Sequence, residues 1–188
     1  MDGNNGEAHY INSFALVAYL PDSVAGFLDR LRSELDPECH AKAHVTILPP
    51  RPLVCTAQEA WDELKQGLGD FQAFTVELGD IQIFPETDVV HVSIDLGNKE
   101  LRRMHAALNR GRLRYTEPYE YEPHVTLAQG LDPTRVKAAE ELASTRWNEF
   151  PGSRSFTVDL MTFVQNTIEN RWKDRAGCLL SSHSNISI

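Results

Sequence analysis

The same four-residue pattern occurs twice in this chain of 188 residues, at positions 80 apart. The first copy is His44-Val45-Thr46-Ile47 and the second is His124-Val125-Thr126-Leu127. We predict a short strand over each copy, at 43–48 and 123–129. Side chains alternate between the two faces of a strand, so each strand places a histidine and a threonine on one face and two aliphatic side chains on the other.

The segments around the two copies match in their predicted elements. Residues 13–84 and 88–164 each read as strand, helix, short strand, helix and strand, with a bulge or turn marked by Gly79-Asp80. This repetition predicts an α+β fold with two lobes related by a pseudo-twofold axis. Antiparallel sheets line a central cleft and helices lie outside. The alternative is an ordinary α+β domain whose elements alternate without symmetry. The predicted elements are the strands 13–20, 43–48, 74–84, 88–96, 123–129, 156–165 and 171–180 and the helices 22–35, 56–68, 98–110 and 132–147.

No linker interrupts the chain between its two ends. We therefore expect a single bilobal domain over residues 13–180, with a flexible N-terminus at 1–12 and a flexible C-terminus at 181–188. Two helix starts carry clear signals. Thr56 and Glu59 form a capping box, and Asp132 precedes a proline at the first helical position.

Composition excludes several classes of protein. Hydrophobic residues make up 41% of the chain, enough for a core, and a net charge of −9 disfavours binding to duplex nucleic acid. No apolar stretch is long enough to span a membrane, and the acidic start does not resemble a signal peptide. Three cysteines without tight pairing argue against a disulfide framework, so we expect a cytoplasmic protein. Cys39, His40 and His44 lack a fourth ligand, so we expect no zinc or other metal.

One segment is basic within this acidic chain. It could contact an RNA backbone, although a solvated helix surface explains it equally simply. Its basic residues are Lys99, Arg102, Arg103, Arg110, Arg112 and Arg114.

Two histidines and two threonines facing one cleft suit the chemistry of a phosphodiester. Imidazole has a reference pKa of about 6.5, so it serves as base or acid near neutral pH. One imidazole can take a proton from a nucleophile while the other gives a proton to the leaving oxygen. Threonine hydroxyls are suitable donors to the non-bridging phosphate oxygens.

These motifs make the chain resemble the 2H phosphoesterase superfamily, which includes 2′-5′ RNA ligase-like proteins and cyclic nucleotide phosphodiesterases. Pro123 before the second motif and the strand pair over 84–96 support the resemblance, which extends from about Ser13 to Leu180. It implies a bilobal α+β fold and metal-independent chemistry at a ribose 2′ oxygen, without a cofactor. It also implies that His44 and His124 are the acid/base pair and that Thr46 and Thr126 bind phosphate.

Four further residues are candidate substrate contacts. Some relatives carry an arginine after the second motif, where this chain has Gln129, and Arg51 in the proline-rich loop after the first motif is a candidate replacement. Phe84 ends a strand where resembling proteins often carry an aromatic residue that stacks on a base. Tyr121, just before the second motif, is placed to line the rim of the cleft. His91, in the middle of a strand, is expected to be a structural histidine.

The leading hypothesis is therefore a phosphodiesterase that opens 2′,3′-cyclic phosphates of nucleotides or RNA ends. Hydrolysis or ligation of 2′-5′ linkages, in 2′-5′ oligonucleotides or cyclic signalling nucleotides, needs the same catalytic pair. A protein that only binds a nucleotide or RNA end is a further alternative. We expect a monomer whose partner is a small nucleotide or an RNA 2′,3′-cyclic phosphate end, with no duplex and no membrane.

Overall fold

Two four-stranded antiparallel sheets form the framework of the protein. The computed structural model describes residues 9–39 and 41–182. The first sheet has the strand order β2 (His44–Pro52), β1 (Tyr10–Tyr19), β7 (Leu160–Thr167) and β8 (Trp172–Leu179). The second has the order β5 (His124–Ala128), β4 (Val89–Leu96), β3 (Phe74–Phe84) and β6 (Ser155–Val158). The helices are α1 (Asp22–Leu35), α2 (Ala57–Leu68), α3 (Asn98–Leu108) and α4 (Pro133–Asn148), with a short 3₁₀ helix η1 (Gly111–Leu113).

The two sheets repeat one pattern, which confirms the predicted α+β, two-lobed architecture. Each sheet has a motif strand at its edge, β2 or β5, paired with the strand that opens the same half of the chain, β1 or β4. The third strand of each sheet comes from the other half. β3 closes the first half but lies in the second sheet, and β7 closes the second half but lies in the first sheet. The halves are therefore interlocked by exchanged strands.

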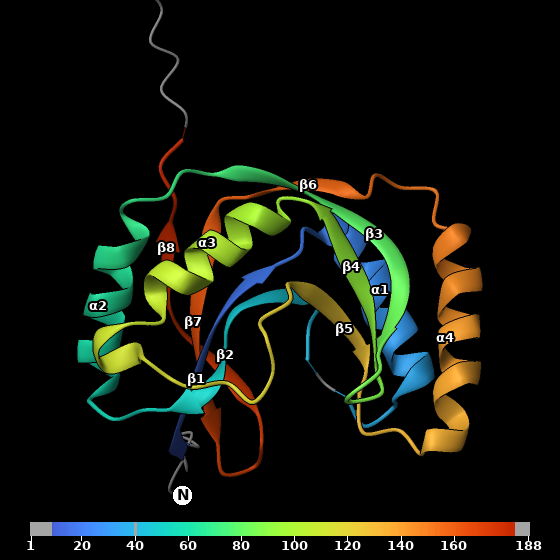
Figure 1. Cartoon of the computed structure of the whole chain (residues 1–188), viewed down its shortest axis with the longest axis horizontal. Helices are drawn as coiled ribbons and strands as arrows, with labels where there is room; N and C mark the ends of the chain where they lie inside the picture. The colour runs from blue at the N-terminus through green and yellow to red at the C-terminus, as the bar shows by residue number, and fades with distance from the viewer. Residues whose placement is uncertain (1–8, 40, 183–188) are drawn as a thin grey trace, which may run out of the picture.

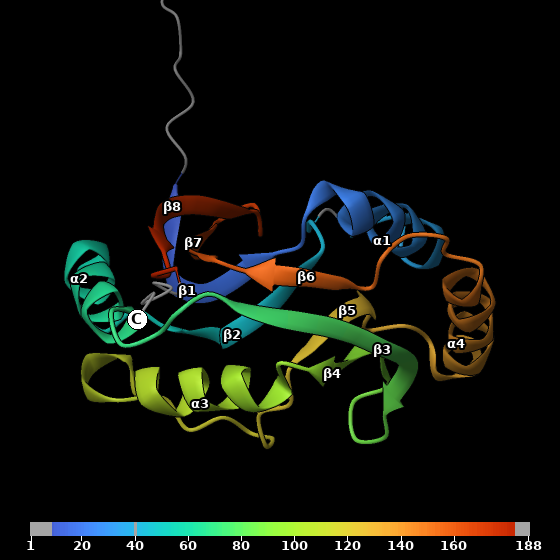
Figure 2. The ribbon, with the colours of Figure 1, turned by 90° about the horizontal axis from the view of Figure 1, so that it is seen from above.

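Two of the helices, α1 and α3, also pack beside the motif strand of the other half (Figure 1). α1 packs against β5 and α4, while α3 packs against β2 and α2. One lobe thus holds α2 and α3 beside the first sheet, and the other holds α1 and α4 beside the second (Figure 2). The apolar faces of both sheets share a single core with the helices, in which Leu16, Ile47, Val92 and Leu127 are fully buried.

The predicted helix starts are confirmed. The Thr56 hydroxyl accepts the backbone N–H of Glu59 at 3.2 Å, and the Glu59 carboxylate accepts the backbone N–H of Thr56 at 2.9 Å. These bonds satisfy two N–H groups that the first turn of α2 leaves without helical partners. Asp132 accepts the N–H of Thr134 at 2.9 Å at the start of α4, with Pro133 in the first helical position.

Two predicted strands differ from the sequence-based expectations, and one predicted bulge agrees with them. β2 does not end at Pro49 but continues to Pro52, because an edge strand pairs on one side only and tolerates residues without an N–H donor. The strand predicted over 156–165 is two strands, β6 and β7, which separate at Asp159 and enter different sheets. The bulge predicted at Gly79-Asp80 coincides with a register shift between Leu78 and Ile81.

The predicted flexible ends also need correction. Residues 10–12 belong to β1, and Ser181 forms a bridge with Gln72. Residues 1–8 and 183–188 lie outside the described residues. None of the described helices has the length and apolar character needed to cross a membrane.

Candidate active site

The motif strands alternate as predicted. Val45, Ile47, Val125 and Leu127 are 0% exposed on the side that faces the core. The histidines and threonines of both motifs are partly exposed on the opposite side. We call this opposite side of each sheet, carrying His44 and Thr46 or the equivalent pair, the inner face.

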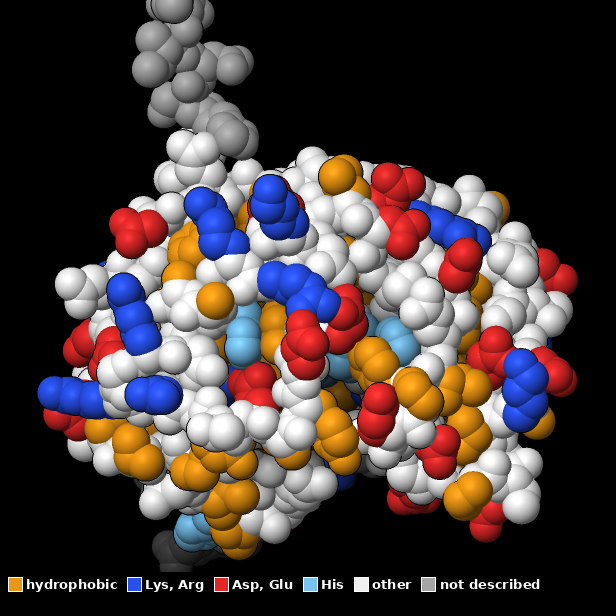
Figure 3. Space-filling view, viewed as in Figure 1, with side chains coloured by type: hydrophobic (Ala, Val, Ile, Leu, Met, Phe, Trp, Pro, Cys, Tyr) orange, Lys and Arg blue, Asp and Glu red, His pale blue; other side chains and the backbone are white. Residues whose placement is uncertain are grey.

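The two motif strands meet in the middle of the molecule. β2 and β5, each at the edge of its sheet, pack against each other (Figures 1 and 2). The hydroxyl of Tyr121, three residues before His124, donates to the backbone carbonyl of Thr46 at 2.8 Å. Figure 3 shows histidine side chains near the middle of one face, with hydrophobic and charged side chains around them. The fold thus brings the two His/Thr pairs together from distant parts of the sequence.

Both motif histidines are held by the same local hydrogen bond. Nδ1 of His44 lies 2.6 Å from the carbonyl oxygen of Lys42, and Nδ1 of His124 lies 2.7 Å from the carbonyl oxygen of Glu122. A carbonyl oxygen only accepts, so Nδ1 carries the hydrogen in each ring. Nε2 of each neutral imidazole is left with a free lone pair, the form that a general base requires.

Burial lowers the pKa of both imidazoles below the ordinary value of 6.5. For His44, the positive charges of Arg32 and protonated His124 lower the pKa further, against the bond to Lys42 and the charge of Asp29.

The charged groups that act on His124 differ from those that act on His44. Burial lowers the pKa of His124, while the Glu122 carbonyl and the Glu122 carboxylate both raise it. His44 is influenced by cations and by the anion Asp29, whereas the charged side chain that acts on His124 is Glu122.

Phe84 lies against the second motif. Its ring meets the imidazole of His124 edge-on, with 4.9 Å between centroids and 84° between planes. On its other flank it stacks on His91, at 3.8 Å and 16°. His91 is 2% exposed and pairs across the sheet with Thr126, so it belongs to the site region. The sequence signal that could have identified His91 as a site residue is its position on the inner face of its strand.

The first motif has a different neighbour. Tyr19 lies opposite His44 across the β1–β2 pair, and their rings are 6.3 Å apart at 78°. The Tyr19 hydroxyl donates to Asp174 at 2.6 Å, which fixes the ring, and burial together with this bond raises the pKa of Tyr19. Sequence reasoning missed Tyr19 because nothing local distinguishes it from a core residue of an apolar strand.

A family model described as the 2′-5′ RNA ligase superfamily matches residues 20–167. The chain belongs to this superfamily. A search of curated proteins gives no match.

Solved structures of low sequence identity share the fold. Escherichia coli LigT complexed with ATP has a TM-score of 0.61 and 17% identity, covering 90% of this chain and 98% of that one. A protein of Thermus thermophilus, TT0787, has a TM-score of 0.61 and 15% identity, covering 92% and 100%. A protein described as a phosphoesterase has a TM-score of 0.61 and 16% identity, covering 93% and 99%. The chain therefore has the same LigT-like fold over nearly its whole length.

The structure corrects the expectation that Arg51 contacts the substrate, because its side chain is buried in a network of protein contacts. Its side chain is 1% exposed and forms an ion pair with Glu117 at 2.5 Å. Its other N–H groups donate to Asn109 at 2.9 Å, to the carbonyl of Leu113 at 3.0 Å and to the carbonyl of Pro49 at 2.9 Å. Four of its five N–H groups therefore have partners within the protein, and the side chain is buried, so its role is structural.

Tyr121 belongs to the same joint between the lobes. Its ring stacks on His105, at 4.0 Å and 7°, and the His105 Nε2 lies 3.0 Å from Glu117. With its hydroxyl committed to Thr46, Tyr121 positions the second motif beside the first. Gln129 follows the end of β5 and is exposed, and no hydrogen bond among the described residues connects it with either motif.

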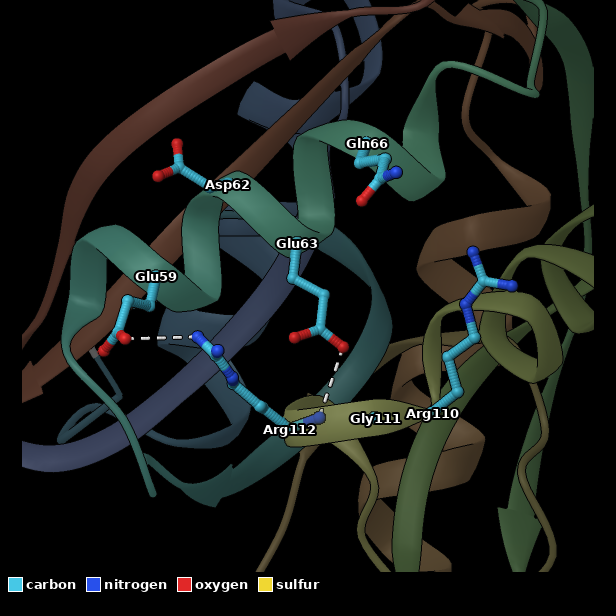
Figure 4. A pocket seen from close by; sticks show the side chains of 7 residues that line it. All are labelled: Glu59, Asp62, Glu63, Gln66, Arg110, Gly111 and Arg112. Carbon is cyan, nitrogen blue, oxygen red and sulfur yellow. Dashed lines mark hydrogen bonds and ion pairs between the residues drawn. The ribbon is translucent and has the colours of Figure 1, made fainter.

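Two of the six residues of the basic segment, Arg102 and Arg112, form ion pairs among the described residues. Arg102 forms ion pairs with Glu120 and Glu122, and Arg112 pairs with Glu59 at 3.2 Å. A groove of about 520 Å³ lies beside this segment, between α2 and η1 (Figure 4). Two of its carboxylates have partners in Arg112: Glu59 accepts from the guanidinium and Glu63 accepts from the backbone N–H.

Proposed function

We propose that this protein is a phosphodiesterase that hydrolyses 2′,3′-cyclic phosphates of nucleotides or RNA ends. Membership of the 2′-5′ RNA ligase superfamily supports phosphodiesterase-type activity. The observation that carries the proposal is the pair of motif histidines on adjacent edge strands, both with Nδ1 bonded to a carbonyl and Nε2 free.

The reaction needs one neutral and one protonated imidazole. One Nε2 takes a proton from water while the water oxygen bonds to phosphorus. The other imidazole gives its proton to the ribose oxygen whose bond to phosphorus breaks. The product is an open 2′- or 3′-phosphomonoester, and the two rings exchange protonation states. Thr46 and Thr126 donate hydrogen bonds to the non-bridging oxygens and hold phosphorus between the rings.

A small nucleotide is the proposed partner. LigT has been solved with ATP, with 3′-AMP and with NADP⁺, so this fold accepts nucleotides of several kinds. Stacking on the face of Phe84 is worth roughly 1–3 kcal/mol for any base. We propose that Phe84 contacts the base in this chain.

Hydrolysis or ligation of a 2′-5′ linkage is the second candidate, since the matching family model carries that name. The catalytic pair would be the same, and only the substrate would differ. We also keep the cytoplasm as the proposed compartment, because Cys39, Cys55 and Cys178 are all free thiols.

The test is a product assay in the presence of EDTA. The protein is incubated with 2′,3′-cyclic AMP, with 2′-5′-linked and 3′-5′-linked diadenosine, and with 5′-hydroxyl RNA plus a 2′,3′-cyclic phosphate end. The ligation arm needs the 5′-hydroxyl, because the 5′ oxygen attacks phosphorus as one ribose oxygen leaves. We expect a single phosphomonoester, 2′ or 3′, from the cyclic nucleotide. Cleavage of the 2′-5′ dinucleotide alone would favour the second candidate. Tight nucleotide binding by calorimetry without any product would leave only a binding protein.

A further inference from the structure

The position beside the threonine of each motif is occupied differently in the two lobes. On the first sheet, Val17 of β1 is the cross-strand partner of Thr46. On the second sheet, His91 of β4 is the cross-strand partner of Thr126. Both side chains are buried, at 4% and 2% exposure. An aliphatic side chain therefore suffices to pack this position, and the imidazole of the second lobe needs another explanation.

His91 and Phe84 form a stacked pair against which His124 stands edge-on. The stack has a centroid distance of 3.8 Å and an angle of 16°. The His124 ring lies 4.9 Å from Phe84 at 84° and 5.2 Å from His91 at 68°. Edge-to-face arrangements at such distances are favourable beyond the area they bury. His124 is thus held from two sides as well as through the Glu122 carbonyl.

His91 performs this role without a charge of its own. Its Nδ1 lies 3.3 Å from the Val89 carbonyl, which orients the ring. Burial lowers the pKa of His91 to about 4, and the ionisable groups that act on it are His124 and Glu122. Above pH 5 the ring is neutral and does not repel a proton on His124.

We propose that His91 is a positioning residue for His124. His91 braces Phe84, and this contact fixes the orientation of the His124 imidazole toward the substrate. The expected effect on catalysis rests on the proposed function. The contacts among His91, Phe84 and His124 do not depend on it. Small misplacements of a reacting group cost large factors in rate, so a loosened His124 ring lowers kcat.

Two substitutions separate the ring from the space it fills. His91→Val reproduces the residue that stands at the equivalent position of the first lobe, and His91→Phe keeps an aromatic ring for the stack. We expect His91→Val to lower kcat on 2′,3′-cyclic AMP about tenfold and His91→Phe to stay within about threefold of the parent.

Titration of the imidazoles by NMR gives a readout that needs no substrate. In His91→Val the pKa of His124 rises toward 6.5, since its ring becomes better hydrated, and His44, whose pKa responds to the charge of His124, is followed in the same spectra. If His91→Val does not fold, Phe84→Leu removes the other ring of the stack from a partly exposed position and carries the same two measurements.

The outcomes distinguish the two proposals. A folded His91→Val protein with parental kcat and an unmoved His124 titration overturns the positioning role. Activity retained in His124→Ala overturns the proposed function instead, and the NMR titration still decides whether His91 braces the ring.

Discussion

The guanidinium of Arg51 and the carboxylate of Glu117 form a buried ion pair 66 residues apart in the sequence. The pair ties the end of β2 to the loop that leads into β5, and Glu117 also contacts His105 on α3. This contact fixes where the second motif lies relative to the first, so its loss affects stability before it affects chemistry.

We expect Arg51→Met and Glu117→Gln each to lower the free energy of unfolding by about 3–5 kcal/mol, because each leaves a buried charge without its partner. Urea denaturation followed by circular dichroism measures the loss. The double variant, which removes both charges, is expected to lose less than the sum of the two. Arg112→Ala is the matched control, since it removes an exposed pair with Glu59 that contributes less than about 1 kcal/mol. Equal losses from the buried and the exposed pair would contradict this assignment.

Replacement of either motif histidine tests the acid/base pair. His44→Ala and His124→Ala are each expected to lower kcat on 2′,3′-cyclic AMP by about 10²–10⁴-fold, since each removes one proton transfer. Circular dichroism should show an unchanged fold, because both side chains are partly exposed. His9→Gln, at an exposed histidine just before β1, is the control for loss of a histidine elsewhere, and parental activity in either motif variant would refute the assignment.

The pH dependence follows from the lowered pKa of both motif histidines. The base must be neutral and the acid protonated, so kcat/KM rises through the pKa of the base and falls through the pKa of the acid. Burial lowers both below 6.5, and we therefore expect a bell-shaped kcat/KM profile with its maximum on the acidic side of pH 6.5. Bound phosphodiester is an anion that favours the protonated imidazole, so the kcat profile should lie at higher pH. A kcat/KM profile that increases up to pH 8 would be inconsistent with this pair.

Phe84 is predicted to recognise the base. Phe84→Leu is expected to raise KM for 2′,3′-cyclic AMP by roughly 5- to 100-fold, the equivalent of losing one base–aromatic stack. The cyclic phosphate of ribose without a base is the discriminating substrate. The parent should prefer the nucleotide over it, and the variant should lose most of that preference. An unchanged preference would place the base elsewhere.

Local patterns in the sequence were sufficient for the elements and for the orientation of the motif side chains. The alternation in residues 44–47 and the capping signals at Thr56 and Asp132 depend on interactions within a few residues, and the structure confirms them. Which sheet a strand joins depends on partner strands that are distant in the sequence. The local pattern over 156–165 therefore does not reveal the step at Asp159 from one sheet to the other.

Individual side chains of the site were harder to assign for the same reason. Arg51 looked like a loop cation with a free guanidinium, but its partner Glu117 is recognisable only when α3 and the following loop are placed over β2. His91 looked structural because its neighbours along the strand are valines. Its contacts with Phe84 and His124 arise from the pairing of three strands, which local spacing does not reveal.

The exchange of strands β3 and β7 means that neither half is a separable module. Cutting the backbone at the turn after Phe84 would leave two fragments, each with an incomplete sheet. The first fragment would lack β7 and β8, and the second would lack β3. Such fragments would have to associate before either could bury its apolar surface. A polypeptide made of one half alone could reach this architecture only as an intertwined homodimer, with each copy lending its last strand to the other.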